Sequence, residues 1–541
     1  ALYTAPISEE TEIGRPGLRR AAHDPDARGV LTRRARVLRS FWIAAIVALY
    51  ALHFPHILAD FPNHSPWMDY AKYTDEGWYA NAATRFTLTG HWYLPGDFNP
   101  AVALPVWPLL LGFVFRFTGV SLAAARLLGL TILGANLLLS YAVVRRHAPQ
   151  WVALLAITML AANPFLYAFS RLALLEPLLV CLMLLCWWLA LRSGAQMRAA
   201  VAAAVGVLLC LMVLTKTTGL LLVPSVLFIL AYACGFRLRP TLRSIGIAAG
   251  CGIALWCAWY FLLIRPHYRA DYDYFFQANR WPQPVGLGGH IAAYWWALHG
   301  LLWVSPALCI TAVALLAIAA MQFIRGEDGQ KTRLWKNPLV LASLLAVAGY
   351  ILLIGMQNHP QPRYYALAAY PLCFLLVLVT GELVRGPALL SRIVGAAGVV
   401  VIAAVCAAGA IRILGYVRHP EYTWLRAATN LGRTIRENPG PNHLLLSVSG
   451  DEVQLMTHLP AICDDYGSWS LADRIRVYQP GWYAAWNEID DDIREELESH
   501  YTVRQVASFP AFDDKDRDVL ILYRLEPLPG AGQIIGSASG K

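Results

Sequence analysis

The chain has 541 residues, of which 57% are hydrophobic and only 15% are charged. Soluble globular proteins carry about 25% charged residues, so the composition excludes an ordinary soluble protein and indicates a polytopic membrane protein with a soluble remainder. The net charge of +9 does not indicate nucleic-acid binding, because the cations lie between apolar segments, where they set membrane topology. The ten cysteines form no CxxC motif and no Cys/His cluster, so we expect neither a disulfide framework nor a zinc site.

The N-terminal 39 residues form a basic arm that we expect to be cytoplasmic and largely disordered. Its first 32 residues are polar and aperiodic and contain Pro, Gly and Arg. The first apolar stretch begins near residue 40, after this arm, and is typical of a retained signal anchor rather than a cleaved signal peptide.

Residues 40–415 predict an all-helical membrane domain. They contain eleven apolar segments, each near the ~20 residues that a helix needs to cross a bilayer. We predict helices over 40–58, 121–143, 151–169, 174–192, 199–215, 218–235, 243–264, 300–322, 338–356, 364–384 and 393–414.

The charges of the connecting loops alternate along the chain. One set of loops is rich in Arg and Lys, as in Arg145-Arg146 and Arg192, and such loops face the cytoplasm. We expect the other set to face outward, because it holds Asp60, Asp69, Asp75, Glu76, Asp97, Glu176, Asp271 and Asp273. An odd number of helices then places the C-terminal region outside, and we expect a multi-pass protein of the inner (plasma) membrane.

Two long outer loops, 59–120 and 265–299, have unusual compositions. The first contains Ala101–Phe117, whose prolines and Arg116 disfavour a full span, so we expect one or two helices in the outer interface. An extra span is the alternative, but it would break the charge alternation. The second loop is rich in Tyr and Trp, which prefer the headgroup level, and either an interfacial belt or a lid over a lipid-linked substrate would explain it.

The composition changes after about residue 420 and predicts a small α/β domain outside the membrane over 420–528, with a flexible tail over 529–541. Helical periodicity and short apolar runs place helices at Thr423–Glu437, Asp451–His458 and Asp490–His500 and strands at 444–448, 503–507 and 519–523. The sequence does not reveal the role of this domain.

The acidic pair Asp75-Glu76 follows the first apolar segment. Carboxylates in such a place are costly unless they have a role, and a carboxylate can take a proton from an attacking hydroxyl or amine. Adjacent residues point in different directions, so we expect the two to have different roles. The simpler interpretation is a helix start after Thr74, because acids suit the first turn of a helix.

Three further outer turns carry charged residues. Arg171 and Glu176 either line the same outer cavity as the acidic pair or form a structural ion pair or cap. Lys216 runs against the positive-inside trend and either contacts a phosphate or snorkels to the interface. Arg363 offers a rigid fork of donors to a phosphate, and Tyr364 adds a hydroxyl. The sequence assigns no metal-ligating residue, and it leaves open a requirement for a divalent cation.

The segment Asp75–Ala83, followed by Thr89-Gly90-His91-Trp92 and a Pro-rich apolar stretch, resembles the first outer loop of GT-C glycosyltransferases. The resemblance is to the protein O-mannosyltransferase and aminoarabinose-transferase-like branch, and it covers about residues 40–415. The later segments at 170–177, 215–216 and 363–371 fall in the order that this branch shows. One departure is Asn99–Pro105, where family loops often have Lys-Pro-Pro, and it leaves the donor and acceptor types open.

The resemblance implies a membrane glycosyltransferase that moves a sugar from a polyprenyl-phosphate carrier to an acceptor on the outer face. It implies that Asp75 is the catalytic base and that Lys216, Arg363 and Tyr364 contact the donor phosphate. The acceptor, whether lipid, glycan or protein, is not identified. The alternatives are a non-catalytic GT-C-like subunit and a lipid or sugar transporter. Polar residues at helix ends and the lack of an internal repeat count against transport.

Overall fold

A computed structural model describes residues 25–529, except 195–196, 281, 325–333, 335, 358–360, 439–441 and 513. The chain divides into two compact units, Ala1–Ala48 and Leu49–Lys541, and each is described by itself. The predictions for residues 1–24 and for the tail from 530 onward lie outside the described residues.

Helix α1 (Pro25–Ala51) begins earlier than the sequence predicts. Residues 25–32 are part of this helix in the structure, whereas the sequence analysis expects this part of the arm to be disordered. Proline suits the first turn of a helix, where its missing N–H has no intrahelical partner. The Ala, Arg and Leu residues that follow are strong helix formers, and they continue the helix into the apolar segment.

Each apolar segment predicted between residues 121 and 414 is largely helical. The long helices are α4 (Leu122–His147), α7 (Glu176–Ser193), α8 (Ala199–Thr215), α10 (Leu238–Trp259), α15 (Pro306–Ile324), α17 (Pro338–Gln357), α18 (Ala366–Val384) and α19 (Leu389–Arg418). Among the described residues, six helices are long and apolar enough to cross a membrane, or eight if two bent pairs each make one span. The predicted count of eleven spans is therefore not confirmed.

Breaks inside the predicted spans account for much of the difference. Helices α5 (Gln150–Ala161) and α6 (Pro164–Arg171) meet at an angle of 61°. At this break Asn163 caps α6, because its side chain accepts hydrogen bonds from the N–H groups of Phe165 and Leu166. Pro164 also has no N–H with which to continue α5.

Two other predicted spans are divided. The segment 218–235 consists of a 3-10 helix (Thr217–Leu222) and α9 (Val223–Ala233). Helices α13 (Gly286–His299) and α14 (Leu301–Val304) join α15 at a bend of 111°.

The two long loops contain helices of their own. The first has α2 (Asp75–Thr89) and α3 (Val106–Thr118), with 3-10 turns at Tyr70–Lys72 and Pro100–Val102. The second has α12 (Arg269–Ala278) and α13, after α10 continues through a π-helical turn (Tyr260–Ile264) and α11 (Arg265–His267). The helix expected near 101–117 is thus present as α3. Its depth in a bilayer stays a prediction.

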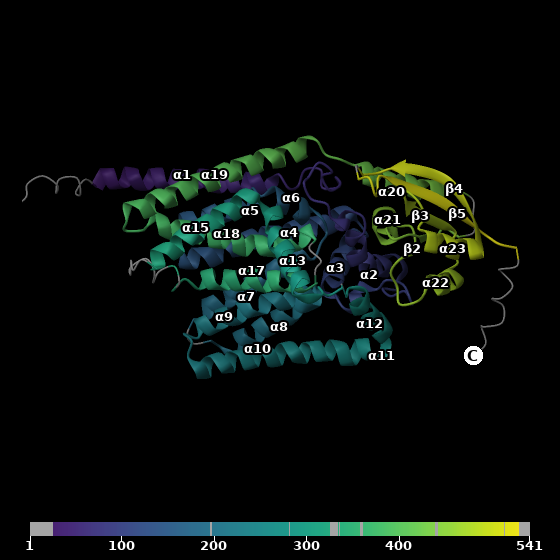
Figure 1. Ribbon diagram of the computed structural model, residues 1–541, viewed down its shortest axis with the longest axis horizontal. Helices are drawn as coiled ribbons and strands as arrows, with labels where there is room; N and C mark the ends of the chain where they lie inside the picture. Colours follow the sequence, from purple (N-terminus) through teal and green to yellow (C-terminus); the bar gives the residue numbers. More distant parts are fainter. Residues whose placement is uncertain are drawn as a thin grey trace, which may run out of the picture. The chain divides into compact units, whose positions relative to one another are not determined.

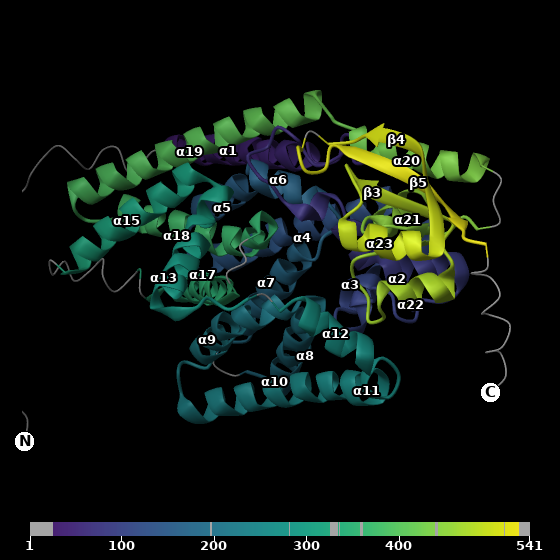
Figure 2. The ribbon, with the colours of Figure 1, turned by 45° about the vertical axis from the view of Figure 1, so that its right-hand side comes forward.

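The C-terminal domain is a mixed sheet with helices on both faces (Figure 2). The strand order is β2-β1-β3-β5-β4, with β1 parallel to β2 and β3, and β5 antiparallel to β3 and β4. Its elements are α20 (Thr423–Glu437), β1 (Leu445–Leu446), α21 (Gly450–Thr457), β2 (Ala461–Ile462), α22 (Leu471–Tyr478), β3 (Trp482–Trp486), α23 (Asp491–His500), β4 (Tyr501–Pro510) and β5 (Val519–Pro527).

The sequence prediction missed β2, α22 and β3. Strand β2 has only two residues, and every residue of β3 is buried, so neither shows the alternation that identifies a half-buried strand.

The first long loop enters the core of this domain, which lies beside α2 and α3 (Figure 1). The Tyr73 ring packs 5.3 Å from the ring of Trp486 and 5.0 Å from that of Phe512. Its hydroxyl donates to Asp514, and the same carboxylate lies 3.4 Å from the ammonium of Lys72. The domain is therefore packed directly against the loop that carries the acidic pair.

Asp60 in the first loop supplies the N-terminal cap of α20. Its carboxylate accepts hydrogen bonds from the backbone N–H groups of Trp424 (2.8 Å) and Leu425 (3.2 Å). We predict that Asp60→Ala lowers the free energy of unfolding by about 1 kcal/mol, as loss of a cap usually does. Asp60→Asn should cost less, because its amide oxygen can still accept one of the two bonds. Thermal unfolding of the purified protein in detergent measures both, and equal losses would contradict the capping role.

Candidate functional site

Asp75 and Glu76 are the first two residues of α2, and both are buried. Among the described residues Thr74, which precedes them, makes no side-chain capping bond to the helix, and its hydroxyl donates instead to Asp75 Oδ1 at 3.2 Å. The positive end of the helix dipole favours carboxylates in this first turn. Both acids therefore lie at a helix start, as the simpler interpretation expects. Their contacts with other side chains distinguish Asp75 from Glu76.

Arg363 joins Asp75 to a second carboxylate, Asp69. The arginine lies in a 3-10 turn (Pro362–Tyr365) just before α18. Its Nη2 is 3.1 Å from Asp75 Oδ2, and its Nη1 contacts Asp69 Oδ1. Its backbone N–H also donates to Asp69 Oδ2 at 2.8 Å. One guanidinium therefore holds two buried carboxylates.

The environment of Asp75 raises the pKa of its carboxyl above the ordinary value. Burial raises the pKa of the Asp75 carboxyl, because the charged form loses hydration. Arg363 lowers this pKa, and the carboxylate of Asp69 raises it again, so that the pKa lies above its ordinary value. A carboxylate in this state is a better proton acceptor near neutral pH than an exposed aspartate.

A second ion pair lies close to the first. Lys216 Nζ is 2.5 Å from Oε1 of Glu176, the first residue of α7. The Tyr364 ring lies between the two pairs in contact distance of both cations. Its centroid is 4.4 Å from Lys216 Nζ and 4.9 Å from the Arg363 guanidinium carbon. We call these six residues the charge cluster: Asp69, Asp75, Glu176, Lys216, Arg363 and Tyr364.

Two atoms of the charge cluster have no polar contact among the described residues. Arg363 Nε and Glu176 Oε2 are buried without a hydrogen-bond partner, whereas Asp75 Oδ2 has only its ion pair with Arg363. Leaving such an atom unpaired costs about 1–3 kcal/mol, and more for a charged group. Buried polar groups in native proteins are nearly always paired, and a water molecule or a polar ligand at this position would satisfy both atoms.

Glu76 has a different set of contacts. Its two carboxylate oxygens accept from Arg126 Nε (2.8 Å) and Nη2 (2.6 Å), and Oε1 also accepts from the N–H of Ala173 (2.8 Å). Arg126 is on α4, and its remaining Nη1 donates to the carbonyls of Ile57 (3.0 Å) and Ala59 (2.7 Å). Glu76 therefore fastens α2 to α4 and is not a member of the charge cluster.

Arg171 is likewise engaged elsewhere. Its Nη1 donates to the Tyr167 hydroxyl at 2.7 Å, and its Nη2 donates to the carbonyls of Pro55 (3.1 Å) and His56. In the described part of the chain no ion pair joins Arg171 to Glu176. Of the seven residues selected from the sequence, the structure thus brings together Asp75, Glu176, Lys216, Arg363 and Tyr364.

Comparisons with known proteins agree with this architecture. The family model of the dolichyl-phosphate-mannose-protein mannosyltransferases matches residues 100–263. ArnT from Cupriavidus metallidurans, solved bound to undecaprenyl phosphate, is 12% identical, with a TM-score of 0.56 over 90% of this chain and 98% of ArnT. AglB from Archaeoglobus fulgidus, solved with an inhibitory peptide and a dolichol-phosphate, is 11% identical, with a TM-score of 0.50 over 87% of this chain and 73% of AglB.

The chain has a GT-C glycosyltransferase fold. The resemblance drawn from the sequence is confirmed as far as the fold. No curated protein sequence matches the chain. Identities of 11–12% establish the fold and leave the substrates to be argued from the site.

Several residues of this GT-C fold were missed as site residues. Asp69 is one of several acids in its loop, and only the fold shows that it shares Arg363 with Asp75. Tyr79 follows Asp75 by one helical turn, and burial together with the Asp75 carboxylate raises the pKa of its phenol well above the ordinary value. Arg126 could have been identified from the sequence, because an arginine inside an apolar segment needs a buried partner.

The acids of the charge cluster are matched with cations rather than grouped as metal ligands. Within the described residues, no group of three or more His, Cys, Asp and Glu side chains could hold a metal ion. Lys216 and Arg363 are the positive charges that the cluster itself provides.

Proposed function

We propose that the chain is a glycosyltransferase that moves a sugar from a polyprenyl-phosphate carrier to an acceptor, with the charge cluster as its active site. The observation that carries this proposal is a pair of buried atoms without hydrogen bonds among the described residues, Arg363 Nε and Glu176 Oε2, beside two cations and a carboxylate of raised pKa. The GT-C fold adds support, since both ArnT and AglB were solved with a polyprenyl phosphate.

In this proposal Lys216 and Arg363 bind the phosphate of the donor. Both cations contact the Tyr364 ring, so a phosphate near that ring can meet both. Arg363 Nε is a buried donor that makes no hydrogen bond to the described residues, and a phosphate oxygen would satisfy it. Tyr364 is the third residue that we assign to the donor phosphate.

Asp75 acts as the general base. An oxygen or nitrogen of the acceptor attacks the anomeric carbon of the donor sugar, and Asp75 takes the proton that the attacking atom loses. The bond between the anomeric carbon and the phosphate oxygen breaks, and the polyprenyl phosphate leaves with the electron pair. The cations stabilise the charge that develops on this leaving group.

The first test replaces the base. Asp75→Asn keeps the size of the side chain and removes its basicity, so we predict a fall of about 10²–10⁴-fold in the turnover of a lipid-linked donor. The fold should persist, because Arg363 keeps its contacts with Asp69. Turnover and thermal stability of purified wild type and variant provide the measurement. A variant that retains most of its activity would show that Asp75 is not the base.

Glu76→Gln is the matched comparison at the neighbouring position. It breaks the charge pairing of Arg126, and loss of one partner of a buried pair costs about 3–5 kcal/mol. We therefore expect Glu76→Gln to lower thermal stability much more than Asp75→Asn does, with activity lost in proportion to folded protein. An active-site role for Glu76 would appear instead as a stable but inactive variant.

The second test concerns the donor phosphate. Lys216→Met keeps the length of the side chain without its charge. A hydrogen bond to a charged group is worth about 1.5–3 kcal/mol, so we predict that the apparent affinity for the donor falls by about 10- to 100-fold. The double variant Lys216→Met/Glu176→Gln removes the carboxylate that the single change leaves unpaired. Unchanged donor KM in both would contradict the phosphate contact.

The third test concerns topology. We propose a multi-pass protein of the inner (plasma) membrane, with a cytoplasmic N-terminus and the C-terminal domain outside, because the loop charges alternate. Ser499 and Ala199 are both exposed and fall on opposite sides in this scheme. A membrane-impermeant thiol reagent added to intact cells should label Ser499→Cys and spare Ala199→Cys, with the parent protein measuring background from native cysteines. The reverse pattern would overturn both the topology and the choice of active face.

A further inference from the structure

Helix α21 of the C-terminal domain lies directly against the start of α2. The contact depends on Gly77, the third residue of α2. A Cβ atom at this position would lie 2.1 Å from the backbone nitrogen of Glu452 and 2.4 Å from the carbonyl carbon of Asp451. These are backbone atoms that cannot rotate away, so only glycine allows the two helices to approach this closely.

Glu452 supplies a cap for α2 at this contact. Its Oε2 accepts a hydrogen bond of 2.5 Å from the N–H of Gly77, which is 375 residues away in the chain. The first N–H groups of a helix have no intrahelical partner, and a side chain just before the helix usually satisfies them. Thr74 does not do so within the described residues, and Glu452 takes its place.

The neighbouring Asp451 holds α2 further along. Its Oδ2 accepts from Asn81 Nδ2 at 3.0 Å, and its Oδ1 accepts from Arg85 Nη2 at 2.8 Å. Two successive acids of α21 therefore form hydrogen bonds with the first turn and with the middle of α2. The helix that begins with Asp75 is fixed from outside by the C-terminal domain.

We infer that Glu452 is a positioning residue for the reaction, holding the first turn of α2 so that Asp75 faces the acceptor. This inference rests on the proposed role of Asp75 as the base. It also gives the C-terminal domain a role, since the domain completes the active site by way of α21. Misplacement of a reacting group by about 1 Å can cost about 100-fold in rate, so a loosened first turn should be visible in turnover.

Glu452 is enclosed by charged groups of two other helices. It is 1% exposed, and the charged groups that face it are Glu76 and Asp75 from α2 and Arg126 from α4. Burial and the Glu76 carboxylate raise the pKa of the Glu452 carboxyl well above its ordinary value. Its carbonyl-type oxygen still accepts the Gly77 N–H. A glutamine has the same shape and the same accepting oxygen, so it should replace Glu452 with little loss.

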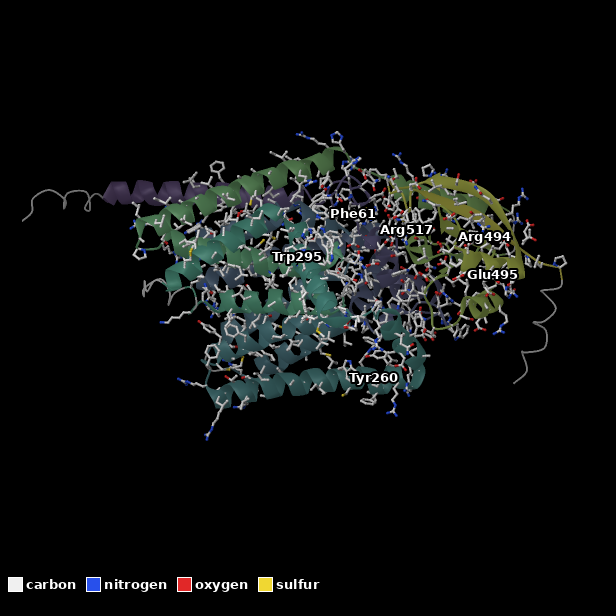
Figure 3. The ribbon with its side chains drawn as sticks, viewed as in Figure 1. Phe61, Tyr260, Trp295, Arg494, Glu495 and Arg517 are labelled. Carbon is white, nitrogen blue, oxygen red and sulfur yellow. The ribbon has the colours of Figure 1, made fainter. Side chains whose placement is uncertain are left out.

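The test compares Glu452→Ala, Glu452→Gln and Glu495→Ala. Glu495 is an exposed acid on α23, labelled in Figure 3, and serves as the matched control. One readout is hydrogen exchange of a peptide that covers Thr74–Ala80, and the other is turnover with a lipid-linked donor. We expect Glu452→Ala to exchange faster over this peptide and to lower kcat by about 10- to 100-fold with donor KM little changed. Glu452→Gln and Glu495→Ala should resemble wild type in both.

Three outcomes would decide against the inference. Unchanged exchange in Glu452→Ala would show that Glu452 does not hold the first turn. Faster exchange with an unchanged kcat would show that the turn is held but that catalysis does not need it. Loss of activity in Glu452→Gln equal to that in Glu452→Ala would point to a role other than accepting this bond. If the alanine variant does not fold, Glu452→Asp replaces it, because its side chain is one methylene too short to reach Gly77.

The failure of the inference is distinguishable from failure of the proposed function. Activity in Asp75→Asn tests the base alone, and exchange over Thr74–Ala80 tests the cap alone. A pH series adds an independent readout. Because the pKa of Glu452 is raised by folding, its contribution to stability is lost as pH rises from the ordinary glutamate value toward the raised one. Glu452→Gln should lack this part of the pH dependence of the melting temperature, and an identical pH profile would contradict a raised pKa of Glu452.

Discussion

The arrangement of this protein depends on the need of two adjacent buried carboxylates for separate cations. Asp75 and Glu76 follow each other at the start of α2, and successive residues of a helix point in different directions. They therefore meet different arginines, Arg363 before α18 and Arg126 on α4. Removing either cation would leave a charge buried without a partner, which costs several kcal/mol. One helical turn thus fixes the position of two long helices.

The contacts of the two acids differ in a way that separates structure from chemistry. Both oxygens of Glu76 are hydrogen-bonded, to a bidentate arginine and to the N–H of Ala173. Asp75 shares its arginine with Asp69, and each of its oxygens has a single polar contact, with the Thr74 hydroxyl or with Arg363. A carboxylate with three hydrogen bonds to the fold is held in place. One that shares its arginine with a second acid can exchange that partner for a substrate.

The sequence predicted most helices and the presence of Asp75 at a helix start, because apolar length and helix-end chemistry are local properties. It predicted that cations from separate turns would meet the acids, and Lys216 and Arg363 do. It could not distinguish Glu76 from Asp75, since their difference comes from Arg126, fifty positions further along the chain. The break at Asn163-Pro164 was readable from its cap and proline, but hydropathy alone concealed it.

The first loop and the C-terminal domain complete each other's helices. Asp60 of the first loop caps α20, and Glu452 of the C-terminal domain caps α2. Each part therefore accepts hydrogen bonds from helix N–H groups of the other. Hundreds of further residues must therefore be synthesised before the first turn of α2 can meet its partner, Glu452. Contacts of such long sequence separation form late in folding, because a large loop must close first. Chains that end before α21 would expose the first turn of α2 without its cap from Glu452. This exposed turn is a physical difference between incomplete and complete chains.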